Sequence, residues 1–409
     1  MSGIFRKVAL SLSAAAVTLT LDGCGIVAAT SPATTTSSST STTTSGTGSV
    51  TYETHYDASD LQWDAAAEVA ITLTDGGSTG GTGVTVDGDT VTITAAGVYR
   101  VTGSLSDGQL VVAVADDANV VLILDNATIT NADGTAIGIT GADSVSIFLA
   151  DGTTNTVSDG ADYTVADDST PVAAIASASD LTIAGNGALV VKGNTNDGIS
   201  SSDGLVIASG TLTVTATDDG VRGKDYVDVL DGTVTVTSGG DSLKSDNTED
   251  TDRGWVRVGG GTLTISSGDD GVDAERALAI TGGTVTVEKS VEGLEAQDLS
   301  ISGGTVTVTA SDDGINATAL GSETTGGTEQ NDGSLFTLSG GTVTVTAGAY
   351  GVDSNGSVAL TGGSLTVTSG SGGGVGAVDA NGTTTLDGAT VTANGTSITS
   401  ADQLGIGRR

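Results

Sequence analysis

Acidic side chains recur at one position of a repeated turn in the second half of this 409-residue chain. Just before the turn residue, which is usually glycine, six successive repeats carry Asp197, Asp219, Asp241, Asp270, Glu292 and Asp313. Positions close to these add Asp218, Asp269, Asp312, Asp273, Glu295 and Asp353. Carboxylate oxygens are hard ligands of the kind that Ca²⁺ prefers, so acids aligned in this way predict calcium sites. The prediction requires a fold that brings successive turns together.

The repeat itself predicts such a fold. A Thr-Val-Thr-Val segment or a close variant begins at residues 211, 233, 262, 284, 305 and 342, with looser copies at 189 and 364. Most successive copies start 21 or 22 residues apart, and a period of this size is typical of a solenoid. Each unit also holds an alternating segment, a Gly-Gly turn and a third short apolar piece, which makes three strands per unit.

These units predict an all-β solenoid. We expect a right-handed parallel β-helix with about 22 residues per coil and three sheets, because crossovers between parallel strands are almost always right-handed. A calcium-binding β-roll is the nearest alternative, but its nine-residue repeat is not visible. Stacking of the coils would form an inward column that reads Ile199, Val221, Leu243, Val272, Leu294, Ile315 and Val352.

Stacking would also bring the acids into a column, because neighbouring coils lie about 4.8 Å apart. Two carboxylates at that distance repel by roughly 3–4 kcal/mol at an effective dielectric constant near 20, and by about 1 kcal/mol in water. Ca²⁺ ions shared between adjacent coils would remove this repulsion, and raised pKa values would reduce it. The alternative is a solvated acidic stripe that salt screens.

Basic residues are few, and five of them lie close together in the sequence: Arg222, Lys224, Lys244, Arg253 and Arg257. Alternation along residues 254–258 directs Val256 and Val258 inward, and it therefore directs Trp255 and Arg257 outward. An outward Trp beside an Arg predicts a platform for a sugar ring and its carboxylate.

The candidate carbohydrate-binding residues are therefore Arg222, Lys224, Lys244, Trp255 and Arg257. In the alternative interpretation, Arg222 and Lys244 only neutralise neighbouring acids, and Trp255 packs beneath an insert at 246–254. The lone histidine, His55, is expected at the surface, which argues against His-based metal sites and Ser-His catalysis.

The N-terminal segment predicts export. Residues 1–23 have two basic residues before an apolar run and indicate a lipoprotein signal peptide. The run ends in Leu-Asp-Gly-Cys, which resembles the bacterial lipobox, so Cys24 is the expected lipidation site. Residues 24–49 are rich in Ser and Thr and are expected to form a flexible tether. The chain is therefore expected to be a membrane-anchored lipoprotein on the bacterial cell surface.

The rest of the chain divides by the regularity of its repeat. Residues 50–190 are expected to form an N-terminal cap and irregular coils, with a separate small β-domain as the alternative. Residues 191–400 are expected to form the regular coils, with inserts near 246–254 and 320–334.

Composition limits the partners. The net charge of −37 argues against nucleic acid or an anionic membrane surface as a direct partner. A single cysteine permits no intrachain disulfide, so stability must come from stacking of the coils, and we expect a monomer.

A series of motifs carries a family resemblance: Gly97-Val98-Tyr99, Gly103-Ser104-Leu105-Ser106-Asp107-Gly108, Asp180-Leu181-Thr182-Ile183, Gly185-Asn186-Gly187, Asn196-Asp197-Gly198-Ile199, Gly223-Lys224-Asp225, Lys244-Ser245 and the Asp-Asp-Gly turns. Their order over roughly residues 55–395 resembles bacterial surface carbohydrate-binding proteins that have a polysaccharide-lyase-like right-handed β-helix with calcium ions between its coils.

The resemblance implies binding of plant-type or acidic polysaccharides, with Ca²⁺ as a structural or bridging ion. It implies a calcium role for Asp219, Asp241, Asp270 and Asp313. Two positions depart from the family pattern: Ser242 replaces the turn glycine, and Tyr350 ends the acidic column.

The leading expectation is a non-catalytic, Ca²⁺-dependent polysaccharide-binding protein. One alternative is a Ca²⁺-dependent, pectate-type polysaccharide lyase, in which Lys244 or Arg222 beside Asp241 would supply the required pair of a cation and a base. Another is a structural adhesin or an ice-binding solenoid built on outward Thr columns, which include Thr284, Thr286, Thr305, Thr307, Thr342 and Thr344.

Overall fold

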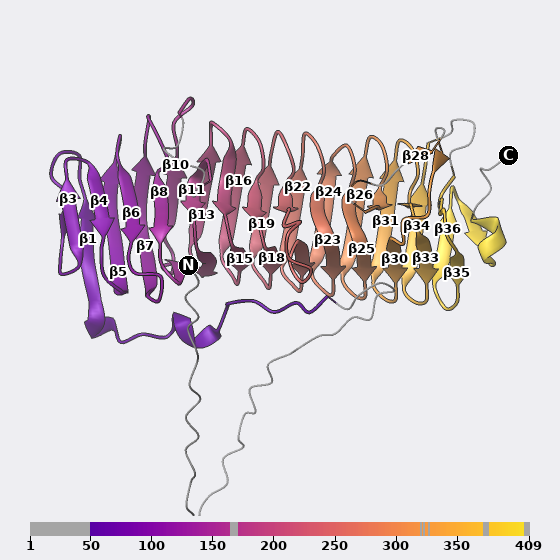
Figure 1. The fold of residues 1–409 in the computed structure, drawn as a ribbon, viewed down its shortest axis with the longest axis horizontal. Helices are drawn as coiled ribbons and strands as arrows, with labels where there is room; N and C mark the ends of the chain where they lie inside the picture. Colours follow the sequence, from indigo (N-terminus) through magenta and orange to yellow (C-terminus); the bar gives the residue numbers. More distant parts are fainter. Residues whose placement is uncertain are drawn as a thin grey trace, which may run out of the picture. The chain divides into compact units, whose positions relative to one another are not determined.

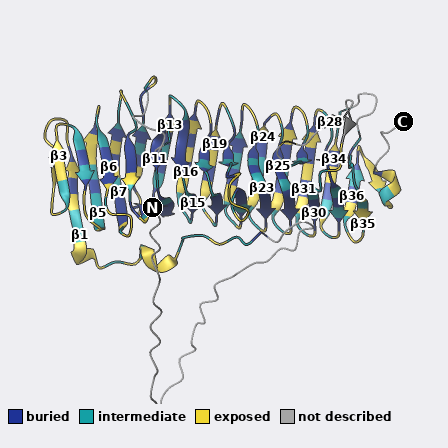
Figure 2. Ribbon diagram, in the orientation of Figure 1, coloured by how far each residue is buried: buried dark blue, intermediate teal, exposed yellow. Residues whose placement is uncertain are grey.

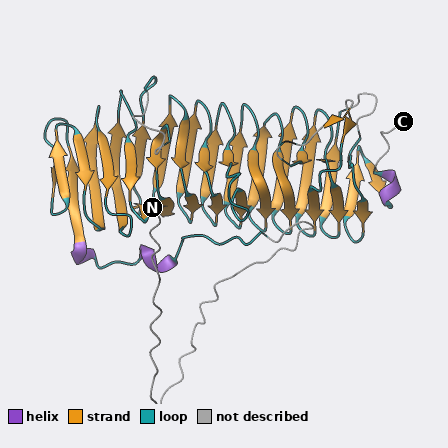
Figure 3. Ribbon diagram, in the orientation of Figure 1, coloured by secondary structure: helices purple, strands orange, loops and turns teal. Residues whose placement is uncertain are grey.

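The computed structural model describes residues 50–163, 171–319, 321, 324–325, 328–370 and 376–404. The expected signal peptide, Cys24 and the tether at 24–49 lie outside these residues. Within them the helices are the short 3-10 segments η1 (Ala58–Leu61), η2 (Ala65–Ala67) and η3 (Ala401–Gln403), and none is long and apolar enough to cross a bilayer. Strands dominate (Figure 3), so the all-β prediction is confirmed.

The strands stack in three parallel ladders, in which each strand pairs with the equivalent strand of the next coil (Figure 1). The first ladder contains β4 (Thr90–Ile93), β6 (Gln109–Ala113), β8 (Ile137–Gly141), β11 (Ala173–Ser177), β14 (Asp197–Ser201), β17 (Val221–Gly223), β20 (Leu243–Ser245), β27 (Ile315–Ala317), β32 (Asp353–Ser354) and the first parts of β23 (Val272–Ile280) and β25 (Leu294–Ile301).

The second ladder continues through the later parts of β23 and β25. Its other strands are β1 (Glu68–Leu73), β5 (Gly97–Leu105), β7 (Asn119–Thr130), β9 (Ser144–Leu149), β12 (Asp180–Gly185), β15 (Gly204–Ile207), β18 (Tyr226–Val229), β21 (Trp255–Val258), β30 (Leu335–Leu338), β33 (Ser357–Leu360) and β35 (Thr384–Leu386).

The third ladder starts from the last residues of β5 and β7. It contains β10 (Thr154–Ser158), β13 (Ala188–Gly193), β16 (Thr211–Ala216), β19 (Thr233–Thr237), β22 (Thr262–Ser266), β24 (Thr284–Lys289), β26 (Thr305–Ala310), β31 (Thr342–Ala347), β34 (Ser364–Thr368) and β36 (Thr390–Ala393).

Antiparallel strands occur at the two ends of the stack and in one side hairpin. At the N-terminal end β2 (Thr79–Gly80) pairs with β1 and β3 (Val84–Asp87) pairs with β4. At the other end β37 (Thr396–Ile398) pairs with β36. A small hairpin joins β28 (Thr324–Thr325) to β29 (Thr328–Glu329). Among the described residues the pairing is otherwise parallel, which confirms the expected solenoid-like stack.

Alternation of side chains builds the core. In β16 and its third-ladder neighbours the Val and Leu residues are buried, and the Thr residues between them face outward (Figure 2). β-branched residues suit such strands because they pack well on a pleated surface. The predicted inward column from Ile199 to Val352 is buried throughout, with no member more than 1% exposed.

A segment that precedes the coils packs on the second ladder. We name residues 50–67 the N-terminal strap. Val50, Tyr52 and Tyr56 of the strap form a cluster with Tyr226 and Trp255. The strap then continues along the stack to β1, where its colour is indigo in Figure 1. It therefore covers outward side chains of the second ladder.

Candidate functional site

The acidic column lies where the chain turns from the third ladder into the first. Glycine is needed at this turn because the coils approach closely. A Cβ added to Gly220 would lie 2.2 Å from the Val236 side chain and 2.7 Å from the carbonyl oxygen of Ser242. An equivalent Cβ on Gly293 would lie 2.2 Å from the carbonyl oxygen of Gly314. Each acid that precedes such a residue is therefore held in a fixed place relative to its neighbours.

The acid before the turn residue accepts a hydrogen bond from the next coil. The backbone N–H of Asp241 donates to Oδ1 of Asp219 at 2.9 Å, and the N–H of Asp270 donates to Oδ1 of Asp241 at 2.9 Å. The same contact joins Asp219 to Asp197, Glu292 to Asp270 and Tyr350 to Asp313. One carboxylate oxygen thus fixes the register of the next coil, and the other remains for a different partner. The sequence does not reveal this contact, because it depends on the backbone geometry of the turn.

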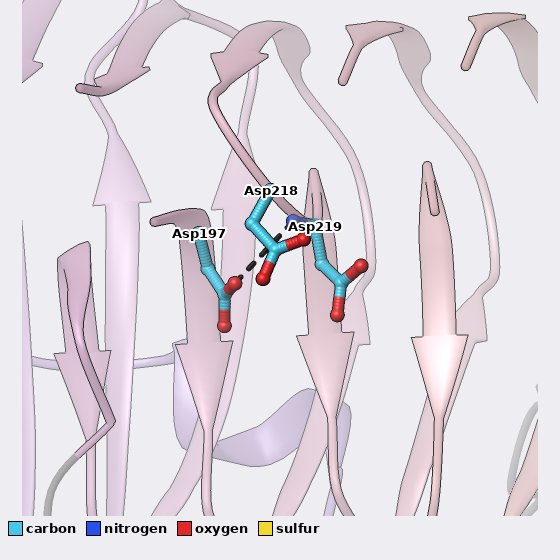
Figure 4. Close-up of side chains that lie close together, drawn as sticks. All are labelled: Asp197, Asp218 and Asp219. Carbon is cyan, nitrogen blue, oxygen red and sulfur yellow. Dashed lines mark hydrogen bonds between the residues drawn. The ribbon is translucent and has the colours of Figure 1, made fainter. Parts of the chain in front are cut away.

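Two groups of these acids bring their oxygens within 4.8 Å of one another. The first acidic cluster contains Asp197, Asp218 and Asp219, whose carboxylates lie on adjacent coils (Figure 4). The second acidic cluster contains Asp270, Glu292 and Glu295. Both clusters consist of residues that the sequence predicted as calcium ligands.

Several carboxyl groups of the column have raised pKa values and therefore resist ionisation. Burial raises the pKa of Asp197 to about 6 and that of Asp219 to about 7, the latter despite the nearby Lys244 ammonium. In the second acidic cluster, burial and the adjacent Glu292 raise the pKa values of Asp270 and Glu295. Proton uptake or cation binding would both relieve this electrostatic cost.

Further predicted acids extend the column beyond the clusters. Burial raises the pKa of Asp313 to about 7, and burial together with Asp241 raises that of Asp273 to about 6. Asp269 and Asp312 are exposed beside the column, and Asp353 pairs in register with Asn316 in the first ladder.

Lys244 lies between the two clusters. Its ammonium is 3.9 Å from Oδ2 of Asp219 and 3.4 Å from Oδ2 of Asp273, and it donates a hydrogen bond to Asp241. These carboxylates come from three successive coils, so the single Lys244 ammonium interacts with the acids at the centre of the column. Hollows lie on both sides of it, of about 320 Å³ at the first acidic cluster and about 450 Å³ at the second.

The other predicted basic residues also contact acids. Arg222 donates to Oδ2 of Asp246 from Nε at 3.2 Å and from Nη2 at 2.7 Å. Lys224 lies 3.7 Å from Glu249. The alternative in which Arg222 and Lys244 neutralise neighbouring acids therefore describes their contacts in the structure.

Trp255 and Arg257 point outward, as alternation predicts, but they do not form an open platform. Trp255 is 0% exposed, because it stacks on Tyr226 at 4.6 Å between ring centroids and meets the edge of Tyr52 at 5.0 Å. Arg257 pairs with the buried carboxylate of Asp228. The cover is the N-terminal strap, and the insert at 246–254 touches it where Arg253 donates to the carbonyl oxygen of Glu53.

The expectation of a surface histidine is wrong. The His55 side chain is 12% exposed, and its Nδ1 lies 2.7 Å from the Tyr226 hydroxyl and 3.0 Å from Asp180. Its Nε2 lies 2.8 Å from the Thr182 hydroxyl. His55 is therefore the polar centre by which the strap is bound to the second ladder. Tyr52 and Tyr56, the aromatic residues near it, are a sequence feature that could have indicated a packed segment, although not the ladder on which it packs.

Comparisons with known proteins show two similarities. A family model described as "Carbohydrate-binding domain-containing protein" matches residues 87–333. The solved structure of the polysaccharide lyase-like protein from C. thermocellum, as a gadolinium derivative, is similar at 34% sequence identity and a TM-score of 0.52. The match covers 58% of this chain and 93% of that one. No curated protein matches the sequence.

Proposed function

Because the chain belongs to the family of carbohydrate-binding domain-containing proteins, we propose that it is a non-catalytic polysaccharide-binding protein whose binding depends on Ca²⁺. The proposal includes a right-handed parallel β-helix, since parallel crossovers are almost always right-handed. It also includes a monomer held on the bacterial cell surface through a lipid on Cys24. Plant-type or acidic glycans are the proposed ligands.

The observation that carries the proposal is the position of Lys244. Its ammonium lies among Asp219, Asp241 and Asp273, where three stacked coils each contribute a carboxylate. The first acidic cluster shares Asp219 with this ammonium, and among the described residues no ion pair links its other two acids, or any acid of the second acidic cluster, to a cationic side chain. At the centre of the column the Lys244 ammonium balances the carboxylates. The acids on either side of it also require positive charge, which a bound cation would supply.

Ca²⁺ fits the donors of the two clusters. It takes six to eight oxygen ligands, and carboxylates are its usual protein ligands. Three carboxylates do not complete that shell, so positions remain for water or for a ligand oxygen. A uronate that approaches the bare column would be repelled, whereas a bound Ca²⁺ would accept the uronate carboxylate as a further ligand.

The contacts of the basic residues argue against the lyase alternative. A catalytic base must be able to lose its proton. Burial lowers the pKa of Lys244, but the Asp241 hydrogen bond and the charges of Asp219 and Asp273 outweigh burial and raise it. Arg222 is engaged by Asp246. Neither side chain is placed as a base.

The test combines calorimetry with glycan retention. Ca²⁺ is titrated into chelator-treated protein, and retention on polygalacturonate is measured with Ca²⁺ and with EDTA. Asp218→Asn and Glu295→Gln each alter one cluster without removing a carboxylate that accepts a hydrogen bond from a backbone N–H of the next coil. Asp116→Asn, an exposed carboxylate outside both clusters, is the matched control.

We expect Ca²⁺ binding and Ca²⁺-dependent retention in the parent and in Asp116→Asn, with weaker binding in the two cluster variants. If the titration shows no heat of binding and retention is the same in EDTA, the proposed role of calcium is wrong. Formation of unsaturated product, detected by ultraviolet absorbance, would instead support the lyase.

A further inference from the structure

From β16 to β36 the outer face of the third ladder is mostly threonine, and its exposed charged residues are Glu288 and Lys289 at the end of β24. One row of in-register positions reads Thr213, Thr235, Thr264, Thr286, Thr307, Thr344, Thr366 and Thr392. A second row, two residues earlier in each strand, reads Thr211, Thr233, Thr262, Thr284, Thr305, Thr342, Ser364 and Thr390. We name these two rows, from β16 to β36, the threonine face.

Preference for threonine in strands does not explain this uniformity. Threonine is a common outward residue in sheets, so the same preference should act on all three ladders. In the first ladder of the same coils, however, the outward column contains Arg222, Lys244, Asp273 and Glu295. The second ladder has Tyr226 and Trp255 at its outward positions. The threonine face is therefore a property of one ladder, in a chain whose net charge is −37.

The described parts of the chain leave this face open. The N-terminal strap packs on the second ladder, and the inserts near 246–254 and 320–334 both leave the coils between the first and second ladders. Most residues of the two rows are exposed, and the rest are half-buried. In Figure 2 they form exposed or intermediate bands between the buried bands of β16, β19 and β24.

The geometry of the face is regular in two directions. Strands of a sheet lie about 4.8 Å apart, and alternate residues of one strand lie roughly 6.6 Å apart. Threonine is β-branched, so its χ1 angle is restricted and its hydroxyl and methyl groups are held in place. The result is a two-dimensional array of nearly identical hydroxyl and methyl groups.

The common kinds of partner do not fit this array. Protein interfaces need aromatic or other anchor residues, and the two rows contain none. Sugar sites are concave and usually carry aromatic rings. A hollow of about 430 Å³ borders the face at Thr211, Thr233 and Thr262, but its lining contains no aromatic residue. Ions need charge, which the two rows lack.

We propose that the threonine face binds the surface of ice crystals. Ice is uncharged, flat and periodic, and each of its surface molecules both donates and accepts hydrogen bonds, as a threonine hydroxyl does. The methyl groups exclude bulk water, and the hydroxyl groups anchor an ordered layer that continues into the crystal. This activity is independent of the acidic column, whose acids lie at the turn from the third ladder into the first and outside the two threonine rows.

The test measures the gap between the melting and freezing points of the protein solution and the inhibition of ice recrystallisation. Thr235→Lys and Thr344→Lys place a strongly hydrated charge in the fully threonine row, and both side chains are exposed. Thr85→Lys, an exposed threonine of the β3 hairpin, is the matched control. Thermal unfolding followed by circular dichroism verifies that all three variants fold.

We expect a measurable gap in the parent and in Thr85→Lys, and its loss in Thr235→Lys and Thr344→Lys. No gap in the parent, or an unchanged gap in the two face variants, overturns the proposal. Retention on a crystalline neutral polysaccharide that is lost only in the face variants, with no effect on ice, also overturns it and assigns the face to a glycan. Chelation of Ca²⁺ should leave the ice activity of folded protein unchanged, which separates this test from that of the proposed function.

Discussion

Replacement of Lys244 by glutamine tests whether the acidic column is a cation site. Glutamine keeps most of the side-chain volume and removes the positive charge. The ammonium that is lost lies 3.4 Å from Asp273 and 3.9 Å from Asp219, and it also contacts Asp241. Lys244→Gln therefore leaves carboxylates of three coils without the cation that they share.

The structure sets the size of the effect. At an effective dielectric constant of 20, unit charges at these two distances attract by roughly 4–5 kcal/mol each. The Lys244 side chain is 25% exposed, so solvent screens part of this attraction. Breaking a buried ion pair costs about 3–5 kcal/mol. Because the Lys244 side chain is partly exposed, we expect Lys244→Gln to lower the free energy of unfolding in EDTA by roughly 2–3 kcal/mol.

Calcium should reverse this loss if the site accepts cations. A ligand that binds only the folded state at a hundred times its Kd stabilises it by about 2.7 kcal/mol. In saturating Ca²⁺ the variant should therefore approach the stability of the parent, and calorimetry should detect one additional bound ion. Lys192→Gln, which alters an exposed lysine outside the first ladder, should change neither quantity.

The measurements are urea unfolding in EDTA and in Ca²⁺, together with the calcium stoichiometry of both proteins. Equal destabilisation in the two conditions, with no additional ion, would refute the reasoning. Lys244 would then be an ordinary partner of its acids, and the argument for calcium at the flanking clusters would fail with it.

Three other predictions address pH, the turn glycine and the strap. The pKa values of Asp197, Asp219 and Asp313 are raised to about 6, 7 and 7, so between about pH 4 and 7 the folded chain binds more protons than the unfolded chain. Calcium-free protein should therefore melt at a higher temperature at pH 5 than at pH 8, and a flat profile would contradict the burial of these groups. Gly220→Ala should destabilise the protein by about 1–3 kcal/mol or more in urea unfolding, because the added Cβ would lie 2.2 Å from the Val236 side chain. The control Gly77→Ala should be nearly neutral, because its Cβ would lie 4.0 Å from the nearest atoms. Tyr52→Ala should expose Trp255 and increase acrylamide quenching of its fluorescence, measured in a Trp63→Phe background, and unchanged quenching would show that the strap does not shield it.

Much of the fold followed from local patterns. The spacing of Thr-Val-Thr-Val, the alternation within each strand and the column from Ile199 to Val352 depend on periodicity alone, and the structure has them as predicted. The N-terminal strap did not follow from the sequence. Its contacts with Trp255 and Tyr226 join residues more than 170 positions apart, and no local pattern of residues 50–67 specifies which ladder they cover.

The candidate site divides in the same way. Alignment of the acids follows from the repeat, so the first and second acidic clusters contain only predicted residues. The partners of the basic residues do not follow from it, because a lysine side chain is long enough to reach several coils. Lys244 was predicted as a sugar contact, yet its ammonium lies among carboxylates. The outward direction of Trp255 was predicted, and its burial was not, because the strap that covers it is distant in sequence.

The strap should also change how the coils unfold. In an array whose units touch only their immediate neighbours, the ends fray independently of the middle. Here Tyr52 reaches Trp255 in β21, His55 reaches Thr182 in β12, and Trp63 meets Phe148 in β9 before the chain enters β1. The strap therefore links the first coils to the central ones, so that these coils should unfold together as one cooperative unit. Among the described residues, no segment links the coils that follow β25 in this way. We therefore expect these coils to unfold before the others.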